Sequence, residues 1–183
     1  MNALFYGERV RLTALRNDDA PTMARWYEDG EFARLFDSSA AYPKTENAMI
    51  KWMDAAERDS NAYALAIRFQ YNDEIIGYVE LDGIQWTHRC AWLAIGIGSP
   101  SHRGKGYGTE AMQLIMRFAF QELNLHRLQL TVFAYNEPAM RMYERLGFQR
   151  EGTFREYLLR DGKRHDMLLY GLLASEWEAH EGR

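Results

Sequence analysis

The sequence predicts an α+β fold, in which helices flank a mixed, mostly antiparallel β-sheet. Segments in which apolar and polar residues alternate recur along the chain, as expected for half-buried strands. Helical patterns separate them in the order β–α–α–β–β–β–α–β–α–β–β, and turn-forming residues stand between neighbouring strand segments. The 183 residues have the length of one domain, so we expect a single domain over residues 1–183.

The first half of the chain predicts one strand, two helices and an antiparallel meander. Thr45 is a favourable N-cap for the second helix. Residues 31–44 show no sustained period and are expected to form a connection. The expected elements are, in order, a strand, two helices and three strands over residues 8–15, 17–29, 45–59, 63–69, 75–84 and 91–97.

The second half predicts two more helices and a terminal hairpin. A helix runs from about Gly106 to residue 123, and alternating residues over 128–134 predict a strand. Asn136 is a favourable N-cap for the next helix, which Gly147 is placed to end. The last elements are two strands joined at Arg160-Asp161-Gly162-Lys163 and a short helical tail, with the strands over residues 148–158 and 165–173.

A glycine-rich loop stands between the third strand of the meander and the following helix. Residues 95–111 read IGIGSPSHRGKGYGTEA, with five glycines and two cations. Glycine lets a ligand approach the backbone, and the first turn of a helix offers free N–H groups to an anion. The segment therefore predicts a phosphate site. It fits neither the P-loop nor the dinucleotide pattern, but it fits Arg-x-x-Gly-x-Gly, beginning at Arg103.

Two motifs resemble the GNAT superfamily of N-acetyltransferases. The Arg-x-x-Gly-x-Gly loop resembles the segment that binds the pyrophosphate of acetyl-CoA in that family. Residues 136–148, NEPAMRMYERLGF, resemble its pattern Asn-x-x-Ala-x-x-x-Tyr followed by Gly-Phe. Asn136 and Tyr143 are seven residues apart and share one helix face. Without the resemblance, these features would also suit a cationic turn and a capped helix with a core tyrosine.

The resemblance extends over nearly the whole chain. The terminal hairpin resembles the branch that contains the ribosomal-protein-alanine and spermidine acetyltransferases, and residues 75–95 resemble the spermidine enzymes most. It implies an acetyl-CoA cleft between splayed central strands. By the same resemblance, acetyl-CoA would contact the following residues: Ile95, Ile97, Arg103, Gly104, Lys105, Gly106, Tyr107, Gly108, Thr109 and Asn136.

The implied reaction is transfer of an acetyl group from acetyl-CoA to a primary amine by direct attack on the thioester. In the family the tyrosine hydroxyl acts as general acid, a role that the resemblance assigns to Tyr143. Glu80, inside a strand, is our candidate for the base, directly or through water; a solvent-facing or salt-bridged carboxylate is the alternative. His88 and His165 are titratable alternatives.

The acceptor is less defined by the sequence. The helical region before residue 60 forms a wall of the acceptor site in the family, so we expect contacts from Glu31, Asp37 and Tyr42, although a solvated connection would look the same. A polyamine or other small amine is favoured, and a protein N-terminus is next. A non-catalytic module that binds acyl-CoA as a sensor or regulator is the alternative function.

The composition of the chain limits the classes of partner that we expect it to bind. A net charge of −4, from 22 basic and 26 acidic residues, argues against nucleic acid and leaves cationic amines open. The single cysteine, Cys90, excludes an internal disulfide and a multi-cysteine zinc site, and we expect no metal. The sequence contains neither a signal-like segment nor a membrane-length apolar run, so we expect a cytoplasmic protein without a membrane partner. A homodimer is compatible with the terminal hairpin.

Overall fold

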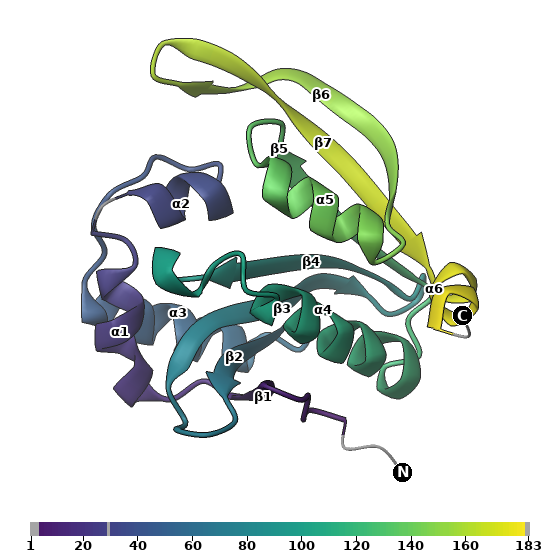
Figure 1. Ribbon diagram of the computed structural model, residues 1–183, viewed down its shortest axis with the longest axis horizontal. Coiled ribbons are helices and arrows are strands. Elements are labelled where there is room, and N and C mark those ends of the chain that lie inside the picture. The colour runs from purple at the N-terminus through teal and green to yellow at the C-terminus, as the bar shows by residue number, and fades with distance from the viewer. Residues whose placement is uncertain (1–3, 29, 182–183) are drawn as a thin grey trace.

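A computed structural model describes residues 4–28 and 30–181. Within these residues seven strands form one sheet in the order β1-β2-β3-β4-β5-β7-β6 (Figure 1). All neighbouring strands are antiparallel except β4 and β5, so the predicted mixed, mostly antiparallel sheet is confirmed. The strands are β1 Val10–Ala14, β2 Tyr63–Phe69, β3 Ile75–Gln85, β4 Cys90–Ile97, β5 Arg127–Phe133, β6 Gln149–Arg160 and β7 Lys163–Leu173.

Helices cover both faces of the sheet. α1 and α3 lie on one face of β1–β4 and α4 lies on the other, each over its own cluster of buried apolar side chains (Figure 1). α4 continues as a π-helical segment over Phe118–Glu122. None of the described helices has the length and apolar character needed to cross a membrane. The helices are α1 Ala20–Arg25, α2 Glu31–Phe36, α3 Glu46–Arg58, α4 Tyr107–Arg117, α5 Glu137–Arg145 and α6 Ala174–Glu181.

Two expectations for the first half need correction. The first helix ends at Arg25 instead of continuing to about residue 29, and Asp29 itself lies outside the described residues. The segment expected to be a connection contains α2. This six-residue helix is too short to show a periodic pattern, and packing holds it: the rings of Phe32 and Phe36 stack with 5.5 Å between centroids, and both lie near Tyr78.

Other local predictions are confirmed. The Thr45 hydroxyl accepts a hydrogen bond from the backbone N–H of Ala48 at 3.1 Å and caps α3. Gly147, with a φ of 93°, follows α5 as expected for a residue that ends a helix. Asp161 and Gly162 form the turn between β6 and β7 with φ values of 50° and 74°, which suits a two-residue hairpin.

The central strands diverge. β4 and β5 pair in parallel only where Cys90, Ala91 and Trp92 face Arg127, Leu128 and Gln129. Beyond these residues β4 pairs with β3 alone, and β5 with β7 alone. The predicted splay between the central strands is therefore present, and it opens toward the glycine-rich loop at the end of β4.

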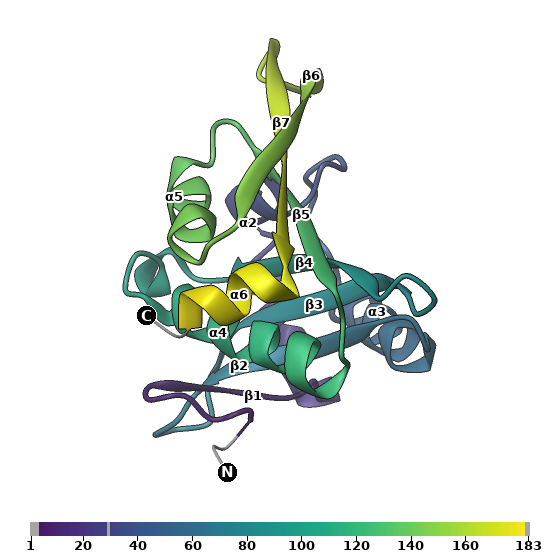
Figure 2. The same cartoon turned by 90° about the vertical axis from the view of Figure 1, so that its right-hand side faces the viewer.

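The β6–β7 hairpin reaches across the opening to α2. Figures 1 and 2 show the hairpin projecting beyond the body of the sheet, with its turn above α2. The guanidinium of Arg34 donates two hydrogen bonds to the Asp161 carboxylate, at 2.9 and 3.1 Å. Nη2 of Arg160 donates to the backbone oxygens of Asp37, Ser38 and Ser39, at 2.9–3.2 Å. These contacts bridge two segments more than 120 residues apart in the sequence.

Candidate active site

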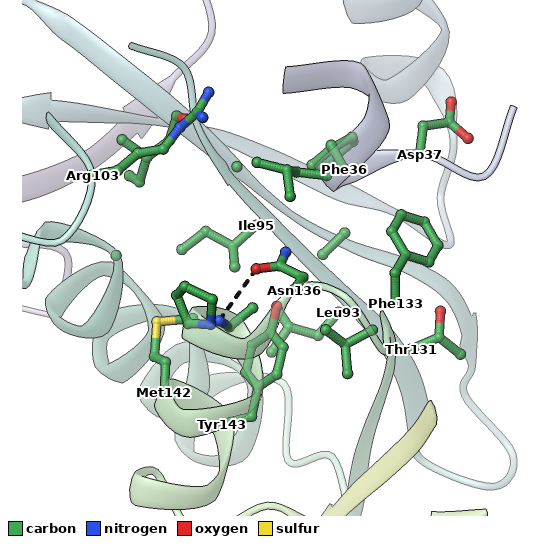
Figure 3. A pocket seen from close by; sticks show the side chains of 18 of the residues that line it. Phe36, Asp37, Leu93, Ile95, Arg103, Thr131, Phe133, Asn136, Met142 and Tyr143 are labelled. Carbon is green, nitrogen blue, oxygen red and sulfur yellow. Dashed lines mark hydrogen bonds between the residues drawn. The ribbon is translucent and has the colours of Figure 1, made fainter. Parts of the chain in front are cut away.

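A cavity of about 810 Å³ occupies the gap between the diverging strands (Figure 3). Its wall comes from β3, β4, β5, α2, α5, the glycine-rich loop with the start of α4, and the β6–β7 hairpin. Basic side chains line one part of it and the carboxylates of Asp37 and Asp82 line another. In Figure 3, Arg103 and Asp37 lie on opposite sides of the view, with Tyr143 below and between them. The volume lies within the range of small-molecule sites.

Backbone groups of β4 face this gap. The N–H of Gly98 donates to the oxygen of Ile76 at 2.9 Å, so residues 98, 96 and 94 direct their polar groups toward β3. Ile95 and Ile97, at the alternate positions, direct theirs away from β3 and toward the cleft, which their side chains also line. The oxygen of Ile97 already accepts a hydrogen bond from Nε of Arg103 at 3.0 Å. The Ile97 N–H and both polar groups of Ile95 remain directed at a ligand.

The glycines of the loop are required for two different structural reasons. Gly104 and Gly106 have φ values of 72° and 85°, and a side chain at Gly104 would project into open space. A Cβ at Gly96 or Gly98 would instead lie within 2.8 Å of an aromatic ring, Phe32 or Trp26 respectively. The presence of five glycines in the segment therefore does not mean that each of them opens the backbone to an anion. Gly96 and Gly98 are small because α1 and α2 pack against them.

The open part of the loop fits a phosphate group. Gly106 is the N-cap of α4, so the free N–H groups of the first turn, next to Gly108 and Thr109, border the cavity. Gly104 leaves room that a side chain would fill. His102 also lines the cavity, and its buried Nδ1 has no hydrogen-bond partner within the described chain. An anion held by backbone amides fits these residues.

The charged residues of the loop are arranged differently from the sequence prediction. Arg103 donates to the oxygens of Ile97 and Gly98 and forms an ion pair with Glu31 at 3.2 Å, so its guanidinium fixes the loop as well as bordering the cavity. Lys105 does not line the cavity with its side chain.

The backbone oxygen of Lys105 accepts a hydrogen bond from Arg9 at 2.9 Å. Arg9 lies over the ring of Tyr107, which packs on Phe69 and not in the cleft. Neither Lys105 nor Tyr107 lines the cavity, and their contact with the cofactor stays a prediction.

Asn136 and Tyr143 meet in the cavity, as the seven-residue spacing predicts. Oδ1 of Asn136 accepts from the N–H of Ala139 at 3.4 Å and caps α5. The Tyr143 ring is buried, and its hydroxyl points into the cavity in Figure 3. This hydroxyl makes no hydrogen bond to any described residue. Burial raises the pKa of the Tyr143 hydroxyl well above its usual value, so the group stays protonated at neutral pH.

Carboxylates gather at the other end of the cleft. Glu80 of β3 faces Ala94 of β4, on the same side of the sheet as Tyr78 and Asp82. Burial, together with the nearby carboxylates of Asp82 and Asp37, raises the pKa of Glu80 to about 7, and Lys44 partly opposes this shift. Asp82 and Ala94 line the cavity but Glu80 does not. Glu80 is thus next to two lining residues, as the partner of Ala94 and two positions before Asp82 in β3.

Two predicted acceptor residues lie elsewhere. Asp37 lines the cavity, but Glu31 and Tyr42 do not. Glu31 pairs with Arg103, and Tyr42 is 58% exposed with the Lys44 ammonium 5.9 Å from its ring centre. A segment without periodicity gave no sign of which of its side chains point inward, so the assignment of Glu31 and Tyr42 to the acceptor is corrected.

Sequence reasoning missed the aromatic wall contributed by β6. The register of β6 against β7 shifts between Phe154 and Leu158, and Glu156 has a φ of 53° within this bulge. The Asp166 carboxylate accepts a hydrogen bond from the Glu156 N–H at 2.8 Å. Phe154 and Tyr157, on either side, both line the cavity. A bulge redirects side chains without leaving a sequence pattern.

A cleft between splayed strands, bounded by an amide-rich loop that fits phosphate, is the arrangement expected of an acyltransferase that uses acyl-CoA. Residues 9–149 match the family described as the acetyltransferase (GNAT) domain. The chain belongs to the GNAT family of N-acetyltransferases, which transfer an acetyl group from acetyl-CoA to amines. It is therefore an enzyme, and the alternative of a non-catalytic acyl-CoA sensor is not needed.

Named relatives and a solved structure resemble the chain over most of its length. The spermidine N(1)-acetyltransferase of Vibrio cholerae is 30% identical, over 88% of this chain and 85% of the relative. The [ribosomal protein uS5]-alanine N-acetyltransferase of Escherichia coli is 25% identical, over 93% and 90%. A crystal structure of spermidine N-acetyltransferase from Vibrio cholerae in complex with CoA and spermine superposes with a TM-score of 0.83, at 25% identity, covering 92% of this chain and 98% of that one.

Proposed function

We propose that the acceptor is a small polycationic amine of the polyamine class. The observation that carries this proposal is the acidic end of the cleft, where Asp37 and Asp82 line the wall and Glu80 is close enough for both to raise its pKa. The carboxylates of Asp82 and Asp37 contribute to the raised pKa of Glu80, and a cation placed among the three relieves that repulsion. A polyamine offers several ammonium groups, one for the attack and others for these carboxylates.

The shape of the acidic end supports a slender acceptor. The contacts of Arg34 with Asp161 and of Arg160 with the 37–39 backbone join α2 to the hairpin across this end. Phe36, Phe154 and Tyr157 add apolar surface to the wall. Alkyl segments of a polyamine suit such a surface, whereas the N-terminus of a folded protein requires an open groove. The resemblance to a spermidine acetyltransferase agrees with this choice.

The proposed roles follow from the positions of the groups. Bound acetyl-CoA supplies a thioester carbonyl to be attacked and a thiolate that leaves. The Ile95 N–H, directed into the cleft, is placed to donate to the carbonyl oxygen as charge develops there. Glu80 takes the proton that the amine nitrogen loses, through a water that reaches past Asp82, because its pKa of about 7 suits a base at neutral pH. Tyr143 gives its hydroxyl proton to the departing sulfur.

The contacts with acetyl-CoA belong to the same proposal. We assign the pyrophosphate to the amides around Gly104, Gly106, Gly108 and Thr109, and the pantetheine arm to the β4 backbone and Asn136. We also keep a single catalytic domain over residues 1–183, a cytoplasmic location and a homodimer as predictions.

The test is thiol release from acetyl-CoA with spermidine, spermine, butylamine, an amino sugar and peptides that begin with Ala or Ser. We expect turnover with the polyamines, and a kcat/KM for butylamine lower by about 10-fold or more, because it lacks the second ammonium. Asp82→Asn should raise the KM for spermidine and leave that for butylamine unchanged. Turnover with the peptides alone would replace the polyamine by a protein N-terminus.

A further inference from the structure

The basic part of the cleft carries more positive charge than the glycine-rich loop accounts for. Within the described chain, three arginines line the cavity. Arg103 belongs to the loop, and its donors are engaged by two backbone oxygens and Glu31. Arg141 and Arg145 come from α5, on the other wall. The pyrophosphate site assigned above makes no use of these two side chains.

Arg145 is the cation whose charge is left uncompensated. Arg141 forms an ion pair with Glu137 at 3.1 Å, one turn earlier in α5. Arg145 is exposed and makes neither an ion pair nor a hydrogen bond to any described residue. The neighbouring carboxylate of Glu144 accepts a hydrogen bond from the Tyr170 hydroxyl at 2.9 Å.

The position of Arg145 along α5 places it beside the loop. A Cβ at Gly108 would lie 3.6 Å from both Ile97 and Met142, so Met142 packs next to the first turn of α4. Arg145 follows Met142 by three residues on the same side of α5, roughly 5 Å further along the helix axis. It therefore flanks the loop on the side away from Asn136, where α5 begins.

An anion could bind at this end of α5 only because of the positive charge of the Arg145 side chain. Arg145 lies in the last turn of α5, where the helix dipole presents negative partial charge and disfavours anions. CoA carries three phosphates, two in the pyrophosphate and one on the 3′ position of the ribose. The amides around Gly104 form one site, which suits the pyrophosphate. We propose that Arg145, assisted by Arg141, binds the ribose 3′-phosphate and so makes the enzyme select CoA over its 3′-dephospho form.

Direct titration of CoA and 3′-dephospho-CoA tests this proposal by calorimetry, without turnover. The wild type should bind CoA more tightly, by about 5- to 10-fold, since an exposed charge pair contributes modestly. Arg145→Gln should raise the Kd for CoA to that for dephospho-CoA, whose own Kd should not change. Arg141→Gln should have a smaller effect in the same direction, and Arg145→Lys should retain part of the preference.

Arg58→Gln is the matched control, because Arg58 is also an exposed arginine in the last turn of a helix, but lies on α3 outside the cleft. It should leave both Kd values unchanged. Equal weakening of CoA and dephospho-CoA by Arg145→Gln would mean that Arg145 contacts the pyrophosphate, and would overturn the proposal. Unchanged affinity in a variant with a wild-type unfolding temperature would also overturn it, as would a wild type that does not distinguish the two ligands.

Discussion

Glu31, in the first turn of α2, forms an ion pair with Arg103 of the glycine-rich loop, with 3.2 Å between Oε1 and Nη1. The same guanidinium donates to the backbone oxygens of Ile97 and Gly98 at 3.0 and 2.7 Å. Arg103 thus connects the end of β4 to α2, and the residue that follows α2, Asp37, lines the acidic end of the cleft. The two ends of the cleft share one short helix.

Glu31→Gln tests whether Glu31 acts as the partner of Arg103, as the structure shows, or as a contact of the acceptor, as the sequence predicts. The two backbone contacts should keep Arg103 in place, so that its charge is less compensated beside the loop. We expect acetyl-CoA to bind tighter by up to about 5-fold, the effect of one exposed charge pair, with the acceptor KM unchanged. Titration of acetyl-CoA and initial rates with varied acceptor measure the two constants. A higher acceptor KM at constant acetyl-CoA affinity would restore Glu31 to the acceptor site.

Gly104→Ala tests the phosphate cradle. The substitution places a methyl group in the open space and imposes a positive φ on alanine, which costs about 1–2 kcal/mol of stability. Gly162→Ala is the matched control, because Gly162 also has a positive φ of 74° and open space around it, but lies in the hairpin turn. Both variants should unfold at similarly lowered temperatures, whereas only Gly104→Ala should weaken acetyl-CoA binding. Equal affinities in the two variants would argue against the cradle.

The pH dependence of turnover tests Glu80. A base must be ionised, and the Glu80 carboxylate becomes so as the pH rises through about 7. The ratio of kcat/KM between wild type and Glu80→Gln should therefore rise across that pH and then level off. Ionisation of the acceptor amine affects both proteins and cancels in the ratio. A ratio that stays constant from pH 5.5 to 8.5 would remove Glu80 from the reaction.

The same carboxyl should lower stability at alkaline pH. In the folded protein its pKa is about 7, above the usual 4.5, so the folded state holds the proton more tightly than the unfolded state. Stability is then fully present below pH 4.5 and declines as the pH rises to about 7. Glu80→Gln should remove this loss, gaining up to about 3 kcal/mol relative to wild type between pH 4 and pH 8. Urea unfolding at the two pH values measures it; no relative gain would contradict the raised pKa.

Arg160→Gln tests the bridge between the hairpin and α2. The arginine donates to three backbone oxygens near Asp37, and hydrogen bonds from a charged group contribute more than neutral ones. We expect the KM for the acceptor to rise about 10-fold while the Kd for acetyl-CoA stays constant. Asp161→Asn breaks a more exposed ion pair at the same turn and should change the acceptor KM less than about 3-fold. Equal effects of the two substitutions would mean that the bridge is held by charge alone.

Strong local signals made most of the fold predictable. Thr45, Gly147 and the Asp161-Gly162 turn each have a conformation that their residue types favour, and they mark element boundaries in the sequence. α2 was missed because six residues held by stacked rings carry no period. The bulge at Glu156 was missed because register depends on the partner strand. For the same reason the sequence did not predict that Tyr157 contributes to an aromatic wall of the cavity.

The candidate site divides in the same way. Asn136 and Tyr143 lie on one helix, whose geometry alone brings them to one face, and both line the cavity. No helix spacing fixes the position of Glu31 relative to the site in this way, because its pairing with Arg103 depends on how α2 packs. Asp82 shares the face of Glu80 by alternation, but which of the two reaches the cavity is decided by the neighbouring elements.

Tyr143→Phe tests the central claim, that this cleft transfers an acetyl group with the tyrosine as acid, most directly. The hydroxyl makes no hydrogen bond to the described residues, so its removal should leave the fold and the Kd for acetyl-CoA unchanged. We predict a fall in kcat of about 10²–10⁴-fold. Tyr170→Phe, which removes a buried hydroxyl bonded to Glu144 instead, should keep its kcat. A wild-type kcat in Tyr143→Phe would contradict the proposed acid.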